Sequence, residues 1–525
     1  MSAAPGAAGF TLTVHGAGFA TGAVLNWNSS ARTTTVLSST ILQATINATD
    51  VAHIGTALVT VVNPTPGGGT SNVTYFPVRQ AAPSASFAPE PGVTPLAGAA
   101  VVGDFNGDGV LDLIVGQNIG GQTGSINFYR GLGNGAFAAP ITSPSTLPVV
   151  ALASGDFNGD GKLDLLISTF DPNGFNSEAV VFINNGFGHF IQQTPFGGGD
   201  GGWISGIADM NGDGILDVLF EATNQGQGVV EIYLGNGDAT FTLIGFAQEN
   251  NFDGTPIGIG DFNGDGKLDI AVAESGQIDV FLGNGDGTVQ DFVPYYCYPC
   301  GGSITAADLN GDGKLDLIVG DLFIFLGNGD GTFTFGKSYA PQGGGYNAVG
   351  DFNGDGKLDV LTAGNNVTLY LGNGDGTFQN FTVSGAFSGV GGMVPFGDFN
   401  RDGQLDIITS GTASDQIGLQ TNLGLTPGSL VFGSIKIGNT SKGQTITLTN
   451  TSAHSLPISS IALTGANAGD YVEHNTCGAG LHVGATCTIS VGFKPTMHGT
   501  RTASVSITYS GVDSPQTVSL TGFGS

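Results

Sequence analysis

Basic side chains are scarce in this sequence. Its 525 residues include 13 Lys and Arg but 42 Asp and Glu, which gives a formal net charge of −29 at pH 7. A surface of this charge repels the phosphate backbone of nucleic acids and the headgroups of anionic lipids, so both are excluded as partners. The sequence also lacks an apolar run of the roughly 20 residues that a membrane-spanning helix needs. We therefore expect no membrane span.

Histidine is rarer still, with seven residues. His189 is the only histidine between residues 81 and 424, where the basic residues are Arg130, Lys162, Lys267, Lys314, Lys337, Lys357 and Arg401. Acid–base catalysis most often depends on His, Lys or Arg side chains that converge on the substrate. This shortage argues against an enzyme, although a metal-assisted mechanism that uses Tyr or Asp stays open.

The four cysteines form two close pairs. Cys477 and Cys487 flank a predicted hairpin and are expected to form a disulfide, which is consistent with an exported protein. Cys297 and Cys300 form a Cys-x-x-Cys sequence. A redox role would need a thioredoxin-like strand–helix context, and zinc would need two further ligands nearby, and the sequence offers neither. We interpret this pair as a second, structural disulfide.

One nine-residue motif dominates the sequence. Its first copy is Asp104-Phe105-Asn106-Gly107-Asp108-Gly109-Val110-Leu111-Asp112, and six further copies open at Asp156, Asp209, Asp261, Asp308, Asp351 and Asp398. Every copy keeps Asp at position 1, Asn at 3, Asp at 5, Gly at 6, Leu at 8 and Asp at 9. Oxygen ligands at alternate positions of a tight loop suit a hard cation, and Gly at position 6 lets the backbone turn sharply.

Calcium fits this donor set best. It takes about six to eight oxygen ligands, whereas magnesium needs a stricter octahedron and zinc prefers His or Cys, which the loops lack. An EF-hand would need a Glu at position 12 and flanking helices, but here the loops run into strand-like sequences such as residues 111–115. Asp-Asn-Asp-Gly clusters also occur as ordinary polar turns. Seven copies with the same ligand positions favour metal binding.

The sequence therefore predicts about seven bound calcium ions. Each loop would bind through its side chains at positions 1, 3, 5 and 9 and through the backbone carbonyl at position 7. The loops hold 21 of the 42 acidic residues, and carboxylates this close repel one another unless a cation lies between them. The predicted ligands are Asp104, Asn106, Asp108, Val110, Asp112, Asp156, Asn158, Asp160, Lys162, Asp164, Asp209, Asn211, Asp213, Ile215, Asp217, Asp261, Asn263, Asp265, Lys267, Asp269, Asp308, Asn310, Asp312, Lys314, Asp316, Asp351, Asn353, Asp355, Lys357, Asp359, Asp398, Asn400, Asp402, Gln404 and Asp406.

The spacing of the motif predicts a propeller over residues 81–424. The copies start 43–53 residues apart, and each interval contains four short strand-like segments, the size of a propeller blade. The first strand of a blade would end at the loop, and the fourth would start at a Thr-Phe pair such as Thr332-Phe333 or Thr377-Phe378. The third would end in a phrase such as residues 281–287. That phrase lacks spaced carboxylates, so we interpret it as a hairpin turn, although ion binding there stays open.

Residues 1–80 and 425–525 have the alternating pattern of two β-sandwiches. In the first, residues 10–14 and 57–62 are predicted strands, and in the second, residues 445–450 and 503–509. Segment 79–83 is a linker. Segment 86–89 is similar to 136–140, which is predicted to open a fourth strand. Because no Thr-Phe pair follows the last loop, we expect residues 85–90 to complete the last blade and close the ring.

All three parts resemble known families. The seven loops resemble the FG-GAP/VCBS family, whose best-known fold is the seven-bladed propeller of the integrin α-chain head, and this implies calcium at the positions named above. Residues 19–28 and 62–69 resemble the TIG/IPT immunoglobulin-like domains, although the usual first strand is missing or short. Residues 476–478, 486–489 and 493–495 resemble the choice-of-anchor and Hydin-like domains. The resemblances imply an all-β chain with a seven-bladed propeller between two immunoglobulin-like sandwiches.

The resemblance also frames the expected function. Loops in all seven blades suggest that calcium has a scaffolding role, and calcium loops of modest affinity work where calcium is millimolar, outside the cell. We therefore expect an extracellular or cell-surface protein that binds an unknown protein or glycan, acts in adhesion and is not an enzyme. Residues 1–5 have no basic or apolar region of a secretory signal, so we expect the given chain to start after its export signal or to lack one.

The alternative is a carbohydrate-active protein, because some propellers of similar type are lectins or polysaccharide lyases. Lyase chemistry needs a base and a cationic or metal clamp on the substrate carboxylate, which the shortage of His, Lys and Arg disfavours. A lectin needs only aromatic faces and acidic or amide groups. Tyr295, Tyr296 and Tyr298 are expected to cluster with Trp203 as candidates for sugar stacking. They could instead pack between blades or cover the central channel.

Overall fold

The structure is a computed structural model of the whole chain. It describes residues 2–3, 6–16, 18–52, 55–64, 69–71, 74–78, 87–90, 99–119, 123–170, 176–224, 227–248, 257–274, 276–296, 302–320, 322–339, 346–363, 367–379, 382–383, 395–400, 404–409, 416–420, 423–427, 429–450, 455–482, 485–509 and 515–525. Within these ranges the structure is built of strands, with one short 3-10 helix, η1 (Ala468–Asp470). The predicted all-β fold is confirmed. Across the same ranges, no helix is long and apolar enough to span a lipid bilayer.

Two sheets precede the repeats, and we call them the N-terminal sandwich. One sheet has the strand order β3-β2-β6-β7 and the other has the order β1-β5-β4. Because alternate residues of a strand point to opposite faces, each sheet gives one apolar face to a shared core, where Trp27 packs on Phe76 with ring centroids 5.1 Å apart. The strands are β1 (Phe10–His15), β2 (Val24–Trp27), β3 (Ser30–Ala31), β4 (Thr34–Val36), β5 (Ile41–Ile46), β6 (Gly55–Val62) and β7 (Thr74–Val78).

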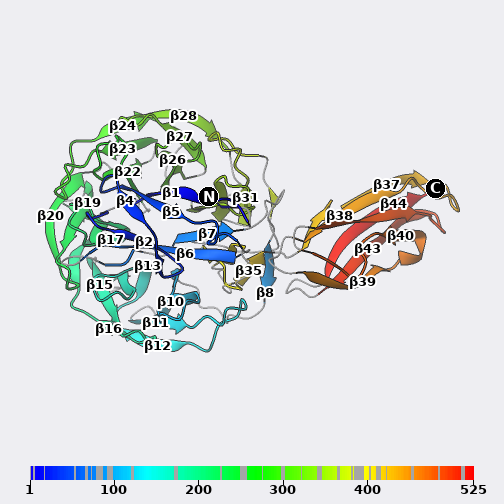
Figure 1. The fold of residues 1–525 in the computed structure, drawn as a ribbon, viewed down its shortest axis with the longest axis horizontal. Coiled ribbons are helices and arrows are strands. Elements are labelled where there is room, and N and C mark those ends of the chain that lie inside the picture. Colours follow the sequence, from blue (N-terminus) through cyan, green and yellow to red (C-terminus); the bar gives the residue numbers. More distant parts are fainter. Residues whose placement is uncertain are drawn as a thin grey trace.

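The repeats form a ring of four-stranded groups (Figure 1). Among the described residues there are seven such groups, which we number as blades 1 to 7 in the order of their loops. The fourth strands β12, β16, β20, β24 and β28 lie at the rim of the ring (Figure 1). Blades 2 and 3 belong to one sheet, because the long strand β17 pairs first with β15 and then with β18.

The first four blades contain β9 (Ala100–Gly103), β10 (Asp112–Ile119), β11 (Thr123–Tyr129) and β12 (Ile141–Ser145); β13 (Val149–Gly155), β14 (Asp164–Phe170), β15 (Asn176–Asn184) and β16 (Phe190–Gln192); β17 (Phe196–Ala208), β18 (Asp217–Asn224), β19 (Gln227–Gly235) and β20 (Phe241–Gln248); and β21 (Gly258–Gly260), β22 (Asp269–Glu274), β23 (Gln277–Phe281) and β24 (Val293–Tyr296). The last three contain β25 (Ile304–Ala307), β26 (Asp316–Val319), β27 (Phe323–Gly327) and β28 (Phe333–Ser338); β29 (Tyr346–Gly350), β30 (Asp359–Ala363), β31 (Val367–Tyr370) and β32 (Thr382–Val383); and β33 (Phe396–Gly397), β34 (Asp406–Thr409), β35 (Gln416–Gln420) and β8 (Phe87–Glu90).

Apolar clusters fill every junction between neighbouring blades, including the junction of blade 7 with blade 1. At that last junction, Leu113 of blade 1 and Ile408 of blade 7 belong to one cluster. The second strand of each blade is buried on both faces, and such strands need a continuous apolar run. This explains why each loop is followed by residues such as 111–115 rather than by an alternating pattern.

The last blade is completed by a segment from before the first loop. Strand β8 pairs antiparallel with β35, with Phe87 opposite Gln420 and Glu90 opposite Ile417. Phe87 is 3% exposed and lies edge-on to Phe352 of blade 6, with ring centroids 6.1 Å apart. The expected latch is confirmed for residues 87–90; residues 85 and 86 lie outside the described ranges.

The start of the fourth strand was predicted correctly in only some blades. It begins at the Phe of the repeated phrase in β16, β20 and β28. In blade 1, Phe137 makes only an isolated bridge with Gly131 and β12 starts at Ile141; in blade 6, Phe378 bridges Gly372 and β32 starts at Thr382. The prediction at Thr377-Phe378 is therefore wrong by a few residues, because Phe378 makes only an isolated bridge and β32 pairs with β31 from Thr382.

The C-terminal part is a second sandwich, which extends away from the ring in Figure 1. Its sheets have the orders β36-β38-β42-β40 and β37-β44-β43-β39-β41. The expected disulfide between Cys477 and Cys487 is present, with the Cα atoms 4.9 Å apart. Cys297 and Cys300 lie outside the described residues. The strands are β36 (Leu423–Thr426), β37 (Ser429–Ile435), β38 (Gln444–Asn450), β39 (Leu456–Thr464), β40 (Tyr471–Asn475), β41 (Gly480–Leu481), β42 (Thr486–Phe493), β43 (Gly499–Tyr509) and β44 (Gln516–Gly524).

A buried acid braces the second sandwich. Asp470 is 2% exposed and accepts hydrogen bonds from Arg501 and from the backbone and hydroxyl of Thr496, at 3.0 and 2.6 Å for Thr496. Burial alone would raise the pKa of Asp470, but the bonds from Thr496 and Arg501 outweigh it and lower the pKa below its usual 3.8. The ionised carboxylate therefore stabilises this domain at neutral pH.

Candidate metal-binding loops

Each loop joins the first strand of its blade to the second, and its glycines set the turn. In loop 1, Gly107 at position 4 and Gly109 at position 6 have φ of 74° and 75°. Loops 2 to 6 repeat these left-handed values at both positions where the structure describes them. L-residues with a side chain rarely adopt this conformation. The seventh loop carries Arg401 at position 4, and residues 401–403, including the predicted ligand Asp402, lie outside the described ranges.

The side chains at positions 1, 3 and 5 turn inward, as predicted. In loop 4, Asp261 Oδ1 accepts the backbone N–H of Asp265 at 3.1 Å and Oδ2 accepts that of Gly266 at 2.9 Å. Asn263 Oδ1 accepts the N–H of Asp265 at 2.8 Å, and Asp265 Oδ1 accepts that of Lys267 at 3.0 Å. The same four bonds recur in loops 1, 2, 3, 5 and 6, with distances between 2.7 and 3.2 Å. Six loops thus share one conformation.

The aspartate at position 9 is the first residue of the second strand, and it is 0% exposed in all seven blades. In blade 5, Asp316 Oδ2 accepts the N–H of Leu309 at position 2 of the loop, at 2.9 Å, and Oδ1 accepts that of Gly327 at the end of β27, at 2.8 Å. Equivalent pairs of bonds are present in blades 1, 2, 3, 4 and 6, and the first bond of the pair is also present in blade 7. This residue therefore ties the loop to the third strand, a role that the motif alone did not reveal.

A glycine at the end of the third strand makes this tie possible. A Cβ on Gly131, Gly283 or Gly327 would lie 2.0–2.1 Å from the carbonyl oxygen at position 8 of the loop. In blade 2 the position is Asn184, whose amide donates to the carbonyls of Leu163 and Phe105 at 2.9 and 2.7 Å. The Leu-Gly phrase in the sequence was the available signal for this contact.

Burial and charge act together on the aspartates at position 9. Burial raises their pKa, the carboxylates at positions 1 and 5 raise it further, and the backbone N–H bonds oppose the rise. The pKa is raised to about 6 in Asp269 and Asp316. It is raised to about 7 in Asp112, Asp164, Asp217 and Asp359. A cation bound between the carboxylates of a loop would oppose this rise in pKa.

The donor chemistry of the loops fits a hard divalent cation. The inward-facing groups are carboxylate and amide oxygens, and the oxygens at positions 3 and 5 accept one backbone N–H each, which leaves each of them a lone pair for a metal. No group of three or more His, Cys, Asp or Glu side chains in the described part of the chain converges closely enough to hold a metal ion. Calcium in these loops therefore stays a prediction.

The side chains of the lysines at position 7 lie outside the loops, so only the backbone carbonyls of these residues are available to a cation. Lys162 Nζ pairs with Asp160 at 2.7 Å, and Lys267 Nζ lies 3.7 Å from Asp265. Their stems cover the glycine that opens the next turn of the same blade, as Lys267 does at Gly285 and Lys314 at Gly329. This packing explains lysine at an exposed position without any catalytic role.

The second repeated phrase forms plain turns. In blade 4, Asp286 Oδ1 accepts the hydroxyl of Thr288 at 2.6 Å and its N–H at 3.0 Å. Bonds of the same kind hold the turns at Asp238, Asp330 and Asp375. The acidic oxygen of each turn is thus used by its own threonine, which supports the interpretation of this phrase as a hairpin turn.

The N-terminal sandwich lies against the loops, over the ring in Figure 1. Thr40, 3% exposed, donates its hydroxyl to Asp261 Oδ2 at 3.1 Å, and Ser39 donates to the carbonyl of Gly266. Tyr75 packs in the clusters at both sides of blade 7, and burial, with Asp104 and Asp398 nearby, raises its pKa. Nothing in the sequence pattern indicated that this domain would contact position 1 of the loops.

The aromatic residues proposed for sugar stacking do not form one cluster. Trp203, 37% exposed, lies in β17, the first strand of blade 3, whereas Tyr295 and Tyr296 lie in β24 at the rim (Figure 1). Tyr295 packs edge-on against Phe333 of the next blade, with ring centroids 5.9 Å apart, so its alternative role between blades is confirmed. Tyr298 lies outside the described residues. The prediction that Trp203 clusters with the tyrosines is wrong, because Trp203 lies in a first strand and Tyr295 and Tyr296 lie in a fourth strand, and two strands separate these positions in a blade.

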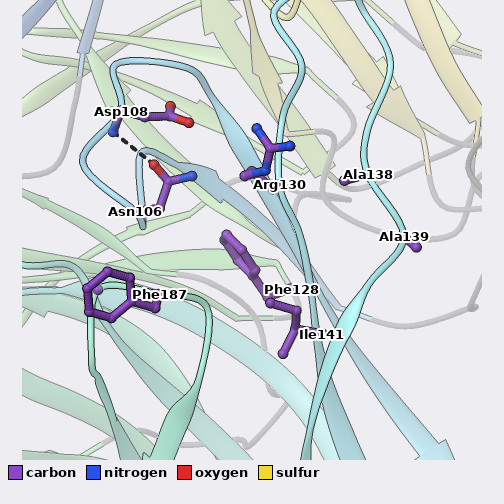
Figure 2. A pocket seen from close by; sticks show the side chains of 9 residues that line it. Asn106, Asp108, Phe128, Arg130, Ala138, Ala139, Ile141 and Phe187 are labelled. Atoms are coloured by element: carbon purple, nitrogen blue, oxygen red, sulfur yellow. Dashed lines mark hydrogen bonds between the residues drawn. The ribbon is translucent and has the colours of Figure 1, made fainter.

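Two cavities border the loops. One, of about 220 Å³, lies between the N-terminal sandwich and loops 1 and 2, and Asn26, Thr60, Asp104 and Asp156 are among its lining residues. The other, of about 350 Å³, lies where blade 1 meets blade 2 (Figure 2). It is lined by Asn106, Asp108, Phe128, Arg130, Ala138, Ala139, Ile141, Gly186 and Phe187.

Comparison with known proteins supports the repeat assignment. A model of the FG-GAP-like repeat matches residues 104–167, 222–272, 261–319, 320–362 and 351–409. A model of the HYDIN/CFA65/VesB-like, Ig-like domain matches residues 422–523. Integrin alpha-PS3 of Drosophila melanogaster is 37% identical over 94 residues, which are 15% of this chain and 8% of that protein. The similarity thus spans less than a tenth of the length of this relative.

Solved structures of similar architecture have low sequence identity. An Agrocybe aegerita lectin, described as recognising non-reducing terminal N-acetylglucosamine, is 18% identical, with 70% of this chain and 95% of that chain covered and a TM-score of 0.38. The periplasmic gluconolactonase PpgL of Pseudomonas aeruginosa is 15% identical, with 64% and 96% covered and a TM-score of 0.40. By its strands and the two family models, the chain is an all-β protein with FG-GAP-like repeats at residues 104–167 and 222–409 and a HYDIN/CFA65/VesB-like, Ig-like domain at residues 422–523.

Proposed function

We propose that this chain is an extracellular or cell-surface protein that binds about seven calcium ions and uses its ring for binding or adhesion. The observation that carries the proposal is the equivalence of the loops. Six of them repeat the same inward-facing oxygen atoms and the same backbone turn, and position 9 is fully buried in all seven. Such uniformity supports one ligand for all loops, and their oxygen donors favour calcium.

We further propose a division into three parts, with a TIG/IPT-like domain at residues 1–80, a closed seven-bladed propeller at 81–424 and an immunoglobulin-like domain at 425–525. The apolar cluster between blades 7 and 1 supports closure, as does the hydrogen bond from the N–H of Gly135 to the carbonyl of Phe399 at 3.0 Å. Adhesion and a surface location are supported by the 94-residue similarity to an integrin alpha chain and by the disulfide Cys477–Cys487.

The calcium ions would have a scaffolding role. In loop 4 one calcium ion would be held by the carboxylates of Asp261, Asp265 and Asp269, by the amide oxygen of Asn263 and by the backbone carbonyl of Lys267. A cation there would neutralise carboxylates that otherwise repel one another beneath the N-terminal sandwich, which rests on Asp261 through Thr40. We propose no enzymatic activity, because the basic residues of the repeats are few and four of the seven occupy position 7 of a loop.

Metal analysis and calorimetry of the full chain test the calcium proposal. We expect elemental analysis to find about seven calcium ions per chain after dialysis against calcium. At a calcium concentration of about 100 times Kd, each site adds about 2.7 kcal/mol to the free energy of unfolding. Excess EGTA should therefore lower the melting temperature of the ring sharply. An unchanged melting curve in EGTA, with metal content measured near zero, would exclude structural calcium.

A lectin-type function is the second candidate, favoured by the cavity of about 350 Å³ with the exposed ring of Phe187 at its edge. A glycan array in the presence of calcium, followed by a product assay on each bound glycan, separates the candidates. Depolymerisation of a bound glycan would overturn the proposal that the chain is not an enzyme. Binding without turnover would favour a lectin-like adhesin.

A further inference from the structure

The junction of blades 1 and 2 departs from the repeat at two exposed positions. The first position directly precedes the residue whose backbone N–H bonds to the aspartate at position 9, such as Gly283 in blade 4. It is Ile183 in blade 2 and Leu in blades 3 to 6, but it is Arg130 in blade 1. The third residue of the second turn is Asp in blades 3 to 6, but it is Phe187 in blade 2. Both substitutions lie on the same cavity, one on each side of the junction.

Arg130 replaces a leucine that packs between neighbouring blades elsewhere in the ring. In blades 3, 4 and 5 the leucine packs against a glycine in the second turn of the next blade, as Leu282 does at Gly331, where a Cβ would meet its Cδ2 at 3.0 Å. Arg130 is exposed and has no ion pair within 4 Å in the described part of the chain. At the junction of blades 1 and 2, Phe128 and Ile141 cover the equivalent Gly188 instead, where a Cβ would lie 2.3 Å from Phe128 Cδ1. Both side chains also line the cavity of about 350 Å³ in Figure 2. This volume is within the range of small-molecule sites, about 300–1,000 Å³.

Phe187 is not needed for the turn that carries it. In blades 3 to 6 the aspartate at this position holds the turn through the hydroxyl and N–H of a threonine, a bond that phenylalanine cannot make. In blade 2 the turn is held instead by Asn185 Oδ1, which accepts the N–H of Phe187 at 2.8 Å and that of His189 at 3.3 Å. The ring of Phe187 is 79% exposed. Exposure of a large aromatic ring costs free energy in water, which contact with a ligand would recover.

We propose that the cavity between blades 1 and 2 binds a neutral sugar residue, with Phe187 against the apolar face of the pyranose ring and Arg130 as a hydrogen-bond donor to its hydroxyl or acetamido oxygens. The proposal rests on the proposed binding function and assigns it a site. Asn106 and Asp108, at positions 3 and 5 of loop 1, also lie on this cavity (Figure 2). With calcium bound in the loop, the remaining amide N–H of Asn106 and the second carboxylate oxygen of Asp108 would supply a donor and an acceptor for hydroxyl groups. A site with both a donor fork and a carboxylate matches hydroxyl groups, which donate and accept.

Charge decides between neutral and acidic sugars. The chain has a formal net charge of −29, and Asp108 faces the cavity beside Arg130. A polyanion approaching this surface is repelled, and at physiological salt the repulsion is screened only beyond a Debye length of about 8 Å. Seven bound calcium ions would still leave the chain with a net charge of −15, so one arginine does not reverse this balance. A neutral glycan meets no such barrier.

Variants that restore the repeat test the site. Arg130→Leu and Phe187→Asp each introduce the residue that blades 3 to 6 carry at the same position, so both are expected to fold with unchanged calcium content and melting temperature. Phe335→Ala removes a phenylalanine that is 53% exposed on β28 of blade 5 and is the matched control. The full chain would be titrated with neutral gluco-, galacto- and manno-oligosaccharides and N-acetylated glucosamine oligomers, and with polygalacturonate and dextran sulfate.

We expect the wild type to bind at least one neutral oligosaccharide, with affinity reduced at least about tenfold in Arg130→Leu and in Phe187→Asp and unchanged in Phe335→Ala. Equal binding by the wild type and both variants would overturn the site but leave a glycan-binding function intact. Binding of the acidic polymers alone would overturn the assignment to neutral sugars. Binding of a protein ligand without any glycan would overturn the site while the proposed adhesion stands, and no ligand of either kind would remove both.

Discussion

Replacing Gly327 with alanine should destabilise the ring, because the structure has no room for a methyl group there. A Cβ on Gly327 would lie 2.1 Å from the carbonyl oxygen of Leu315, which belongs to the loop of the same blade. Real Cβ atoms do not approach a backbone oxygen this closely, so the third strand and the loop must move apart. The N–H of Gly327 donates to Asp316 Oδ1 at 2.8 Å, and the same movement stretches this bond.

The magnitude follows from these two effects. Overpacking of a close-packed site costs about 1–3 kcal/mol, and loss of one hydrogen bond costs about 0.5–1.5 kcal/mol. The free energy of unfolding should therefore fall by about 2–4 kcal/mol. At about 2 °C for each kcal/mol in a large domain, the melting temperature should fall by about 4–8 °C.

Gly336 in the same blade is the matched control. A Cβ at this position comes no closer than 3.5 Å to any neighbour, so Gly336→Ala should leave the melting temperature within about 2 °C of the wild type. Differential scanning calorimetry of both variants would be run in excess calcium and in excess EGTA. Because the clash involves no cation, Gly327→Ala should lower the melting temperature in both buffers. Equal melting temperatures for the two variants would refute the steric argument.

Three further changes give separate tests. Phe87→Ala should lower the free energy of unfolding of the ring by about 3–5 kcal/mol, since Phe87 is 3% exposed and anchors the latch, whereas a ring that melts like the wild type would show that β8 does not hold it closed. Asp470→Asn should lower the free energy of unfolding by about 1.5–3 kcal/mol at pH 7. Because the folded pKa of Asp470 is lowered, the difference from the wild type in chemical denaturation should shrink as the pH falls below about 3.8. A difference that persists in acid would contradict this. Joint replacement of Cys477 and Cys487 by serine should lower the denaturation midpoint of the C-terminal sandwich by the equivalent of about 2–4 kcal/mol, and an unchanged midpoint would mean that the disulfide does not stabilise it.

The loop conformation could be predicted because its determinants are local. Positions 1, 3, 5 and 6 lie within six consecutive residues, so the spacing of Asp261, Asn263, Asp265 and Gly266 is enough to specify which oxygen atoms turn inward. A continuous apolar run likewise predicts the second strand of each blade, and a short phrase shared with other blades predicts the latch at β8. In each case the residues that interact recur in the same order in every copy.

Contacts between distant segments were not predictable in this way. Trp203 and Tyr295 were expected to lie together because both are aromatic, but their places in the strand order of two blades separate them. The same Thr-Phe pair opens β28 at Phe333 but precedes β32, which starts at Thr382, so the local pattern alone does not fix where pairing begins. The cavity at Arg130 also requires two blades to meet, although its two unusual residues are visible in an alignment of the repeats.

The sequence by itself determined the all-β fold, the repeated loops with their oxygen donors and the four-stranded period, because each is specified by side chains within a few residues of one another. Only the tertiary structure decided that Asp316 ties its loop to the third strand through Gly327, and that Thr40 of the N-terminal sandwich reaches Asp261. Residues 40 and 261 are 221 positions apart. Their contact depends on how the sandwich docks on the assembled ring, and a surface made from several blades exists only after the chain has folded.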